Sequence, residues 1–278
     1  MARLPRQIAR ALLPERLRQR LERMATRDAG HGYDVLGLHP DWVAMATALT
    51  GPLYQRYFRA TSHGAAHIPQ EGGAILAANH SGTLPIDAVL IYQDVLRHTD
   101  PPRVPRPVGD RFLPHLPFVS TFFARVGMAA GTRGNVHHLL SSGELLLVFP
   151  EGTPGIGKGW AKRYQTQTFR VGHAELAIRH RVPVIPVGVV GAEEALIQLA
   201  RIDGVHPFGA PYLPIPLTPF PLPTRIHVRY GAPLALHEDL PEGAEEDPEV
   251  LQRAAERVRQ AVQDLLDEGL AERKGIFR

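Results

Sequence analysis

The feature that most constrains the fold of this chain is a short apolar run, followed by turn-forming residues and then by a helical pattern. The run Ala74–Ala78 is typical of a buried strand. It stops at Asn79-His80-Ser81-Gly82, in which Asn, Ser and Gly favour a turn. Pro85 suits a helix start, and apolar residues follow it at helical spacing. The sequence therefore predicts a strand, a turn that carries His80, and a helix with Asp87 in its first turn.

The alternation of strand and helix patterns continues along the chain. We expect helices at 86–96, at 169–181 and from residue 247 on, and strands at 145–149, at 182–190 and, at a sheet edge, at 225–230. This alternation predicts an α/β fold with a mostly parallel central sheet and helices on both faces. In an open sheet of this kind, the turns after the strands lie beside the ligand crevice. His80 is therefore expected at that crevice.

The first 60 residues have a different character. Leucines recur every three or four residues in 1–28, among arginines that form a basic face: Arg3, Arg6, Arg10, Arg16, Arg18, Arg20, Arg23 and Arg27. The stretch 41–58 is apolar and aromatic. Because basic amphipathic helices bind anionic lipid, we expect a helical membrane-contact segment over 1–60 and an α/β domain over 61–278. The alternative is a pair of ordinary helices packed on the domain. A proline-rich stretch, 207–223, is expected to form an extended loop that faces lipid.

Composition excludes several classes of function. The chain has no cysteine, which excludes disulfides, thiolate metal sites and a cysteine nucleophile. No spaced set of metal ligands is visible, so neither a metal nor a cofactor is expected. The net charge is only +3, and no aromatic residue lies among the N-terminal arginines, which argues against a nucleic-acid partner. We see no secretory signal, and no apolar run reaches the roughly 18 residues of a spanning helix.

The pair His80 and Asp87 has a definite chemical use. A neutral imidazole can take a proton from an attacking hydroxyl, and a carboxylate can orient the ring and stabilise the imidazolium that forms. The alternative is structural, with His80 capping a turn and Asp87 interacting with a helix N-terminus. The two residues alone do not decide between these interpretations.

A second motif follows the predicted strand at 145–149. The residues from Gly152 to Lys158 spell G-x-x-x-x-G-K, as in a phosphate-binding P-loop of a nucleoside triphosphatase. However, Gly159 stands where the magnesium-binding Ser or Thr should be, and Pro154 lacks an N–H for phosphate. We therefore expect no P-loop. Lys158, Arg163 and Arg170 are weaker candidates for a phosphate contact, and we interpret them as solvated charges.

The residues at 149–153, FPEGT, downstream of the NHSGTLPID turn, resemble the glycerolipid acyltransferase superfamily, the group of lysophosphatidic acid acyltransferases. Two further blocks in the same order support the resemblance, GMAAGTR at 127–133 and VPVIPV at 182–187. The family's usual signature has four residues between His and Asp, whereas six lie here and Pro85 stands at the usual Asp position. The turn looks like a divergent branch, similar to bacterial relatives of the transmembrane acyltransferases that make neutral lipids.

The resemblance implies acyl transfer from a thioester, on coenzyme A or acyl carrier protein, to a lipid hydroxyl. His80 would be the general base and Asp87 its orienting partner, provided that the two extra residues bulge from the turn. The acceptor would be a glycerolipid such as 1-acyl-glycerol-3-phosphate, in phospholipid biosynthesis, or alternatively a neutral mono- or diacylglycerol. The enzyme would act peripherally on the lipid surface at the cytoplasmic face of a membrane. The rival interpretation is a non-catalytic membrane-binding protein on the same fold.

The resemblance also implies substrate-binding roles for five residues. Arg133 would contact an acceptor phosphate, because its planar fork binds two oxygens at once, and Thr132 would add a hydroxyl donor. Gly152 would let the chain turn tightly beside the substrate. Glu151 and Thr153 would either bond the acceptor head group or hold the loop.

Overall fold

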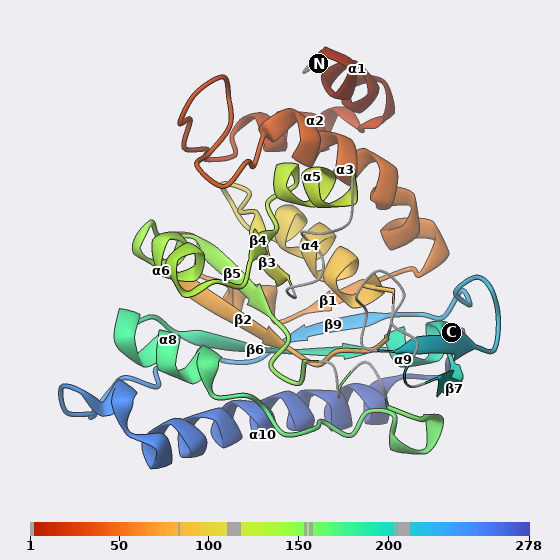
Figure 1. Cartoon of the computed structure of the whole chain (residues 1–278). Helices are drawn as coiled ribbons and strands as arrows, with labels where there is room; N and C mark the ends of the chain where they lie inside the picture. Colours follow the sequence, from red (N-terminus) through yellow and green to blue (C-terminus); the bar gives the residue numbers. More distant parts are fainter. Residues whose placement is uncertain are drawn as a thin grey trace.

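The computed structural model describes residues 3–82, 84–109, 118–152, 155, 158–202, 204 and 212–278. A central sheet separates two layers of helices (Figure 1). The long helix α10 (Pro248–Glu272) runs along the bottom of the view, and the N-terminal helices lie at the top. The chain therefore has the layered α/β architecture that the strand and helix patterns predict.

In the described part of the chain, seven strands form the main sheet. From one edge to the other they are β1 (Thr61–His63), β9 (His227–Tyr230), β6 (Val184–Val190), β2 (Ala74–Ala78), β5 (Leu145–Val148), β3 (Pro105–Gly109) and β4 (Ala129–Ala130). Every neighbouring pair is parallel except β6 with β9. The prediction of a mostly parallel sheet is therefore confirmed.

One strand lies elsewhere than predicted. The sequence predicts an edge strand over 225–230, but β9 lies between β1 and β6. The edge is occupied by β1, which pairs with β9 in parallel from Thr61↔His227 to His63↔Arg229. The sequence of β1 is only Thr-Ser-His, so it carries no apolar run that predicts a strand. Its pairing depends on β9 rather than on its own composition.

Helices cover both faces of the sheet. One face packs against α6 (Arg133–Ser141), α8 (Gly172–His180) and α10, whose buried side chains form one apolar cluster with those of the strands. The other face packs against α4 (Ile86–His98) and the π-helical turn η1 (Leu53–Tyr57). Each face therefore has its own core, and the predicted arrangement is confirmed. Because both faces are covered, all five residues of β2 are buried.

The N-terminal helices pack on this domain. In α1 (Arg3–Leu12), α2 (Glu15–Glu22) and the segments that join them to α3 (Pro40–Pro52), the buried apolar residues form a third cluster together with residues of α3 and α4. Leu17 and Leu21, for example, are buried together with Val43 and Leu96. The apolar stripe of 1–28 therefore faces the protein, as in the alternative of ordinary packed helices, while Arg6, Arg16, Arg23 and Arg27 are exposed. The division at residue 60 and the membrane role stay predictions.

The remaining elements are short. They are α5 (Val119–Arg125), α9 (Ala192–Ala195), the 3₁₀ turns η2 (Ala65–His67), η4 (Trp160–Lys162) and η6 (Ala244–Glu246), and a separate antiparallel pair, β7 (Gln198–Ile202) and β8 (Leu213–Pro216). The predicted loop over 207–223 therefore contains a short strand, while 207–211 lie outside the described residues. Within the described ranges, no helix is long and apolar enough to cross a membrane.

Candidate active site

Three neighbouring parallel strands end at the same edge of the sheet. Strand β2 is followed by His80, β5 by Glu151 and β6 by Glu193, because β2 pairs in parallel with both β5 and β6. The carboxyl ends of parallel strands meet at one edge, which is where an open α/β sheet binds ligands. Three residues that lie far apart in the sequence are thus brought together at this edge of the sheet.

The turn after β2 brings His80 and Asp87 together. Nδ1 of His80 lies 2.7 Å from Oδ2 of Asp87, which also accepts hydrogen bonds from the backbone N–H and the hydroxyl of Ser81, at 2.8 and 2.9 Å. The other oxygen, Oδ1, accepts from the N–H of Ala88 at 2.7 Å. The carboxylate of Asp87 therefore reaches the ring of His80 although six residues separate them in the sequence.

Asp87 is held as a carboxylate. Its burial alone would raise the pKa, because the side chain is fully buried. The charge and hydrogen bond of His80, together with the N–H groups of Ser81 and Ala88, outweigh burial and keep the pKa of Asp87 below its ordinary value. An ionised Asp87 only accepts hydrogen bonds, so Nδ1 of His80 donates and Nε2 becomes the basic ring nitrogen.

The ring and the backbone of His80 are also fixed. The imidazole stacks on Phe149, with ring centroids 4.3 Å apart and an angle of 22° between the planes. The backbone N–H of His80 donates to Oε1 of Glu151 at 3.0 Å. The end of β5 thus supports the turn after β2 through both an aromatic contact and a carboxylate.

The structure places Glu151 inside the protein. Its side chain is fully buried, and Oε2 accepts from the N–H of Gln167 at 2.9 Å and pairs with Nζ of Lys158 at 3.3 Å. Both oxygens therefore have partners within the chain, which is the arrangement of the loop-holding alternative. The interpretation of Lys158 as a solvated charge is wrong, because its side chain is only 3% exposed. Its position between carboxylates also leaves no phosphate-binding role for it.

Gly152 has the backbone conformation that glycine favours. Its φ is +59°, and its N–H donates to the carbonyl of Phe149 at 3.0 Å to close a turn. A Cβ at this position would lie 2.8 Å from the guanidinium carbon of Arg170. A cationic group therefore lies directly against the turn, on an exposed side chain. Thr153 lies outside the described residues.

Thr132 and Arg133 lie farther along the same edge. The hydroxyl of Thr132 caps α6 by accepting from the N–H of Asn135 at 3.3 Å, and Arg133 is the first residue of that helix and is exposed. They follow β4, which is separated from β2 by β5 and β3. The structure therefore does not bring this pair into contact with the His80–Asp87 pair.

An apolar cavity of about 480 Å³ opens beside the helix that carries Asp87. Leu53 and Tyr57 line it from η1, Ile86 lines it from the start of α4, and Phe220 lines it from the loop after β8. Its volume lies within the range of ordinary ligand sites, which is about 300–1,000 Å³. The arrangement suits a ligand with a long apolar chain.

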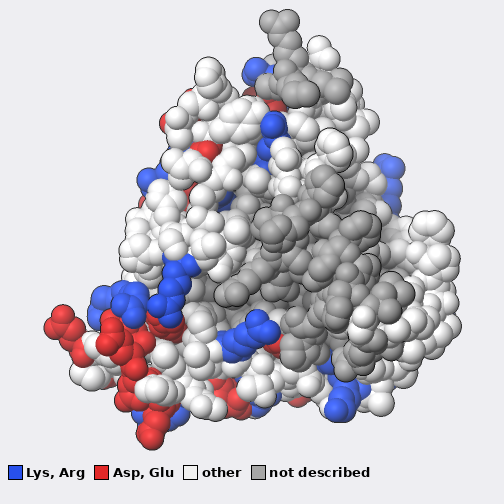
Figure 2. Space-filling model, viewed as in Figure 1, with Lys and Arg blue, Asp and Glu red and all other residues white. Residues whose placement is uncertain are grey.

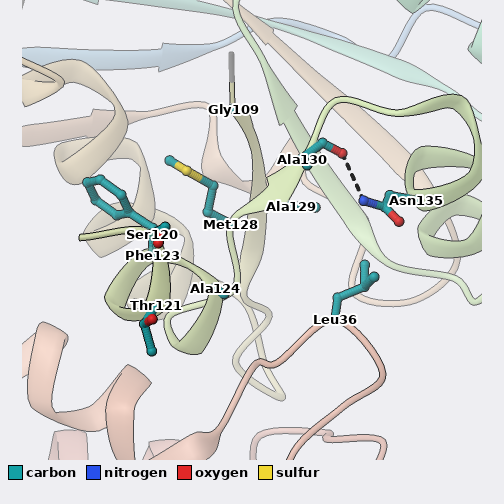
Figure 3. A pocket seen from close by; sticks show the side chains of 10 residues that line it. All are labelled: Leu36, Gly109, Ser120, Thr121, Phe123, Ala124, Met128, Ala129, Ala130 and Asn135. Carbon is teal, nitrogen blue, oxygen red and sulfur yellow. Dashed lines mark hydrogen bonds between the residues drawn. The ribbon is translucent and has the colours of Figure 1, made fainter. Parts of the chain in front are cut away.

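Two further cavities lie nearby and share wall residues. One, of about 100 Å³, shares Pro85 and Val89 with the large apolar cavity. It also shares Phe123 and Met128 with a third cavity, of about 380 Å³, between α5 and the ends of β3 and β4 (Figure 3). The side chain of Asn135, near the start of α6, reaches the wall of this third cavity. Shared wall residues thus run from the neighbourhood of the His80–Asp87 pair, called the dyad below, to the start of α6.

The sequence did not point to Glu193 or to the burial of Lys158. Nζ of Lys158 lies 3.0 Å from Oε1 of Glu193, whose side chain is 5% exposed. Burial raises the pKa of Glu193, and the charge of Lys158 opposes that rise. The available signal was the pair of adjacent glutamates directly after a buried strand, at the edge where the other site residues lie. No cluster of metal-ligating side chains occurs in the ranges that the structure describes.

Comparison with known proteins agrees with the architecture and the motifs. A family model described as Acyltransferase matches residues 59–190. An uncharacterized protein of Mycobacterium tuberculosis is 33% identical over 274 residues, which covers 94% of this chain and 74% of that protein. The "DGAT1/2-independent enzyme synthesizing storage lipids" of Bos taurus is 28% identical over 209 residues, or 74% of this chain and 58% of that enzyme.

A solved structure shares the fold. The crystal structure of the 1-acyl-sn-glycerophosphate acyltransferase PlsC from Thermotoga maritima superposes with a TM-score of 0.57 and 18% identity, and the match covers 84% of this chain and 81% of that one. The family match, the relatives and the shared fold agree with the order of the sequence blocks. This chain belongs to the glycerolipid acyltransferase superfamily.

Proposed function

We propose that this protein transfers a fatty acyl group from a thioester, on coenzyme A or acyl carrier protein, to the hydroxyl of a glycerolipid. The observation that carries the proposal is the 2.7 Å contact between His80 and an ionised, buried Asp87, beside an apolar cavity. Nε2 of His80 takes the acceptor's hydroxyl proton while the oxygen attacks the thioester carbonyl. The tetrahedral intermediate collapses, the thiolate leaves, and the proton on Nε2 passes to it. No acyl-enzyme is required.

The apolar cavities support a substrate with fatty chains. The turn that precedes Asp87 contributes Leu84, Pro85 and Ile86 to the large cavity, so a chain bound there would end next to the dyad. A cavity with so few polar atoms binds a hydrocarbon chain by removing it from water, at about 0.8 kcal/mol per buried CH₂ group.

For the acceptor we propose a phosphate-bearing glycerolipid such as 1-acyl-glycerol-3-phosphate. Two exposed arginines at the carboxyl edge of the sheet are the candidates for the phosphate, Arg133 at the start of α6 and Arg170 against Gly152. The second candidate is a neutral mono- or diacylglycerol, which is favoured by the apolar cavities and by the similarity to the storage-lipid enzyme. We further propose that the role of Glu151 is to hold the loop rather than to bind substrate.

We also propose peripheral attachment to a lipid surface, at the cytoplasmic face of a membrane. Leu53 is 41% exposed, Tyr57 37% and Phe220 76%, and all three line the large apolar cavity. The loop that holds Phe220 projects at the right of Figure 1, where few charged side chains show in Figure 2. Acidic side chains instead gather at the lower left of Figure 2, around the start of α10. Lipid contact at the cavity mouth would let an acyl chain pass from the membrane to the dyad.

Product analysis tests the activity. The purified protein is incubated with acyl-CoA or acyl carrier protein donors and a mixed pool of acceptors, and the products are identified by mass spectrometry. We expect one class of acylated glycerolipid and a loss of roughly 10²–10⁴ in rate for His80→Ala. His137→Ala, at an exposed histidine of α6, is the matched control and should keep full activity. Near-normal turnover by folded His80→Ala would refute the catalytic role of His80.

Kinetics of arginine variants decide the acceptor class. With a lysophosphatidic acid, losing the phosphate contact should lower kcat/KM by roughly 10- to 150-fold, the equivalent of ~1.5–3 kcal/mol of charged hydrogen bonding. Arg133→Ala and Arg170→Ala are each assayed with lysophosphatidic acid and with monoacylglycerol. Small and equal effects of both variants on both acceptors would favour the neutral glyceride.

A further inference from the structure

The strand ends are joined by a buried chain of charges that acyl transfer itself does not use. This series of contacts begins at the backbone N–H of His80 and continues through Glu151 and Lys158 to Glu193, and it is called the network below. We propose that Lys158 and Glu193 are positioning residues, which act through Glu151 to hold the backbone of His80 where the base can reach the acceptor. The inference rests on the proposed acyl transfer and adds two residues to its site.

The first part of the network links Glu151 to His80, the proposed base. Oε1 of Glu151 accepts the N–H of His80 at 3.0 Å, while Oε2 is held by the N–H of Gln167 at 2.9 Å and by Lys158 at 3.3 Å. Two partners on Oε2 thus orient the carboxylate so that the other oxygen faces the catalytic turn. A movement of Glu151 would release the backbone of His80 directly.

The second part of the network joins Lys158 to Glu193, which follows β6. Oε1 of Glu193 lies 3.0 Å from Nζ of Lys158, and Oε2 accepts the N–H of Tyr164 at 2.9 Å. Lys158, Glu151 and Glu193 are 3%, 0% and 5% exposed at their side chains. The contacts therefore lie in the interior, where water screens charges least. Each of the strands β2, β5 and β6 is thus followed by one residue of this network.

The two buried carboxylates explain why the ammonium group of Lys158 lies in the interior. Apolar side chains of similar volume would hold three strand ends together without the cost of removing charges from water. What the ammonium adds is compensation for carboxylates that must stay in the interior. One of these carboxylates, Glu151, aims an oxygen at a backbone donor of the base. A base displaced by about 1 Å can lose roughly 10²-fold in rate, so this constraint has value for catalysis.

The arithmetic of the network predicts an unusual pattern of variants. Two carboxylates and one ammonium leave one uncompensated negative charge, and Lys158→Met raises this to two. Adding Glu193→Gln to Lys158→Met returns the network to one negative charge and removes the repulsion on Glu151. A network that only joined the strands would behave differently, since the second change would then remove one more contact and worsen the first.

Steady-state kinetics with the full chain test the pattern. We expect Lys158→Met to lower kcat by roughly 10- to 100-fold with little change in KM, because the base is displaced while substrate contacts remain. The double variant Lys158→Met/Glu193→Gln should recover kcat by roughly tenfold, a coupling typical of contacting charges. Lys162→Met is the matched control, because Lys162 is an exposed lysine four residues away, and it should leave kcat unchanged. Failure of the double variant to recover kcat would overturn the proposal.

Amide hydrogen exchange gives a readout that does not depend on activity. Loss of the bond from His80 to Glu151 should speed exchange of the His80 amide about 10- to 150-fold in Lys158→Met, and the double variant should slow it again. Amides inside β2 should not change. Unchanged exchange at His80 in Lys158→Met would overturn the inference whatever the activity of the protein. Absence of acylated product from the wild-type protein would instead overturn the proposed function, so the two failures are distinguishable.

Discussion

Replacing Asp87 by Asn tests the dyad with the least change of shape. The carboxylate now accepts four hydrogen bonds, three at Oδ2 from His80 and Ser81 and one at Oδ1 from Ala88. An amide has only one oxygen. If that oxygen faces His80, the amide NH₂ meets the N–H of Ala88, donor against donor. If the amide is reversed, its NH₂ group donates to Nδ1 and the ring proton moves to Nε2. Nε2 must be unprotonated to act as the base, so this tautomer is inactive.

The expected loss of rate in Asp87→Asn follows from the loss of the carboxylate's negative charge. During proton transfer the imidazole becomes an imidazolium beside the carboxylate. Two unit charges about 4 Å apart, at an effective dielectric constant near 20, attract by about 4 kcal/mol. Because each ~1.4 kcal/mol is worth tenfold in rate, Asp87→Asn should lower kcat by on the order of 10³. KM should change little, since Asp87 is fully buried and lies behind the ring.

Release of free coenzyme A thiol is a suitable assay. The chain has no cysteine, so a thiol reagent reports only the product. The matched control is Asp94→Asn, which removes a second fully buried carboxylate of α4 that accepts hydrogen bonds from Tyr54 and Ser62. That variant should lose stability but keep its kcat once folded. A folded Asp87→Asn protein within about threefold of wild-type kcat would refute the orienting role of Asp87, given the factor of 10³ expected above.

Three further outcomes are expected. Serine at Leu53, Tyr57 and Phe220 together should weaken liposome binding at least about tenfold, because each large apolar side chain is worth ~1.5–3 kcal/mol when buried; unchanged sedimentation with liposomes would place membrane contact elsewhere. Burial lowers the pKa of His173 to about 4, so stability should fall as pH drops from about 6.5 toward 4, by about 3 kcal/mol in total. His173→Leu should flatten that fall in urea titrations at pH 7 and pH 4.5, and an unchanged pH slope would contradict the assignment. ATP should not raise the melting temperature, since Lys158 is enclosed by carboxylates; bound ATP would add ~2.7 kcal/mol at a hundred times its Kd.

Local patterns were sufficient for the architecture. The strand, turn and helix over 74–98 can be predicted because each depends on neighbours within a few residues: an apolar run, turn formers, and a proline followed by helical periodicity. The alternation of such units implies a parallel sheet. A parallel sheet in turn implies that His80 and Glu151 lie at one edge. Strand β1 escaped prediction because its three residues depend on the partner strand for their conformation.

The direction in which a side chain faces was decided by contacts between distant segments. Lys158 looks like a solvated charge in its glycine-rich surroundings, but Glu151 and Glu193 surround it because three strands end together. The leucines of 1–28 have the spacing of a lipid-binding face, yet that face is filled by α3 and α4. A periodic pattern shows that a helix has an apolar side without showing what covers it.

The sequence by itself thus determined the α/β class, the superfamily motifs and the pairing chemistry available to His80 and Asp87. Only the tertiary structure decided that Glu151 faces inward to the backbone of His80, that Lys158 lies between two buried carboxylates, and that an apolar cavity opens beside Asp87. The physical reason is that secondary structure follows from short-range sterics and periodicity. Burial and ion pairing, in contrast, depend on which strand ends and loops the folded chain brings within a few ångströms of one another.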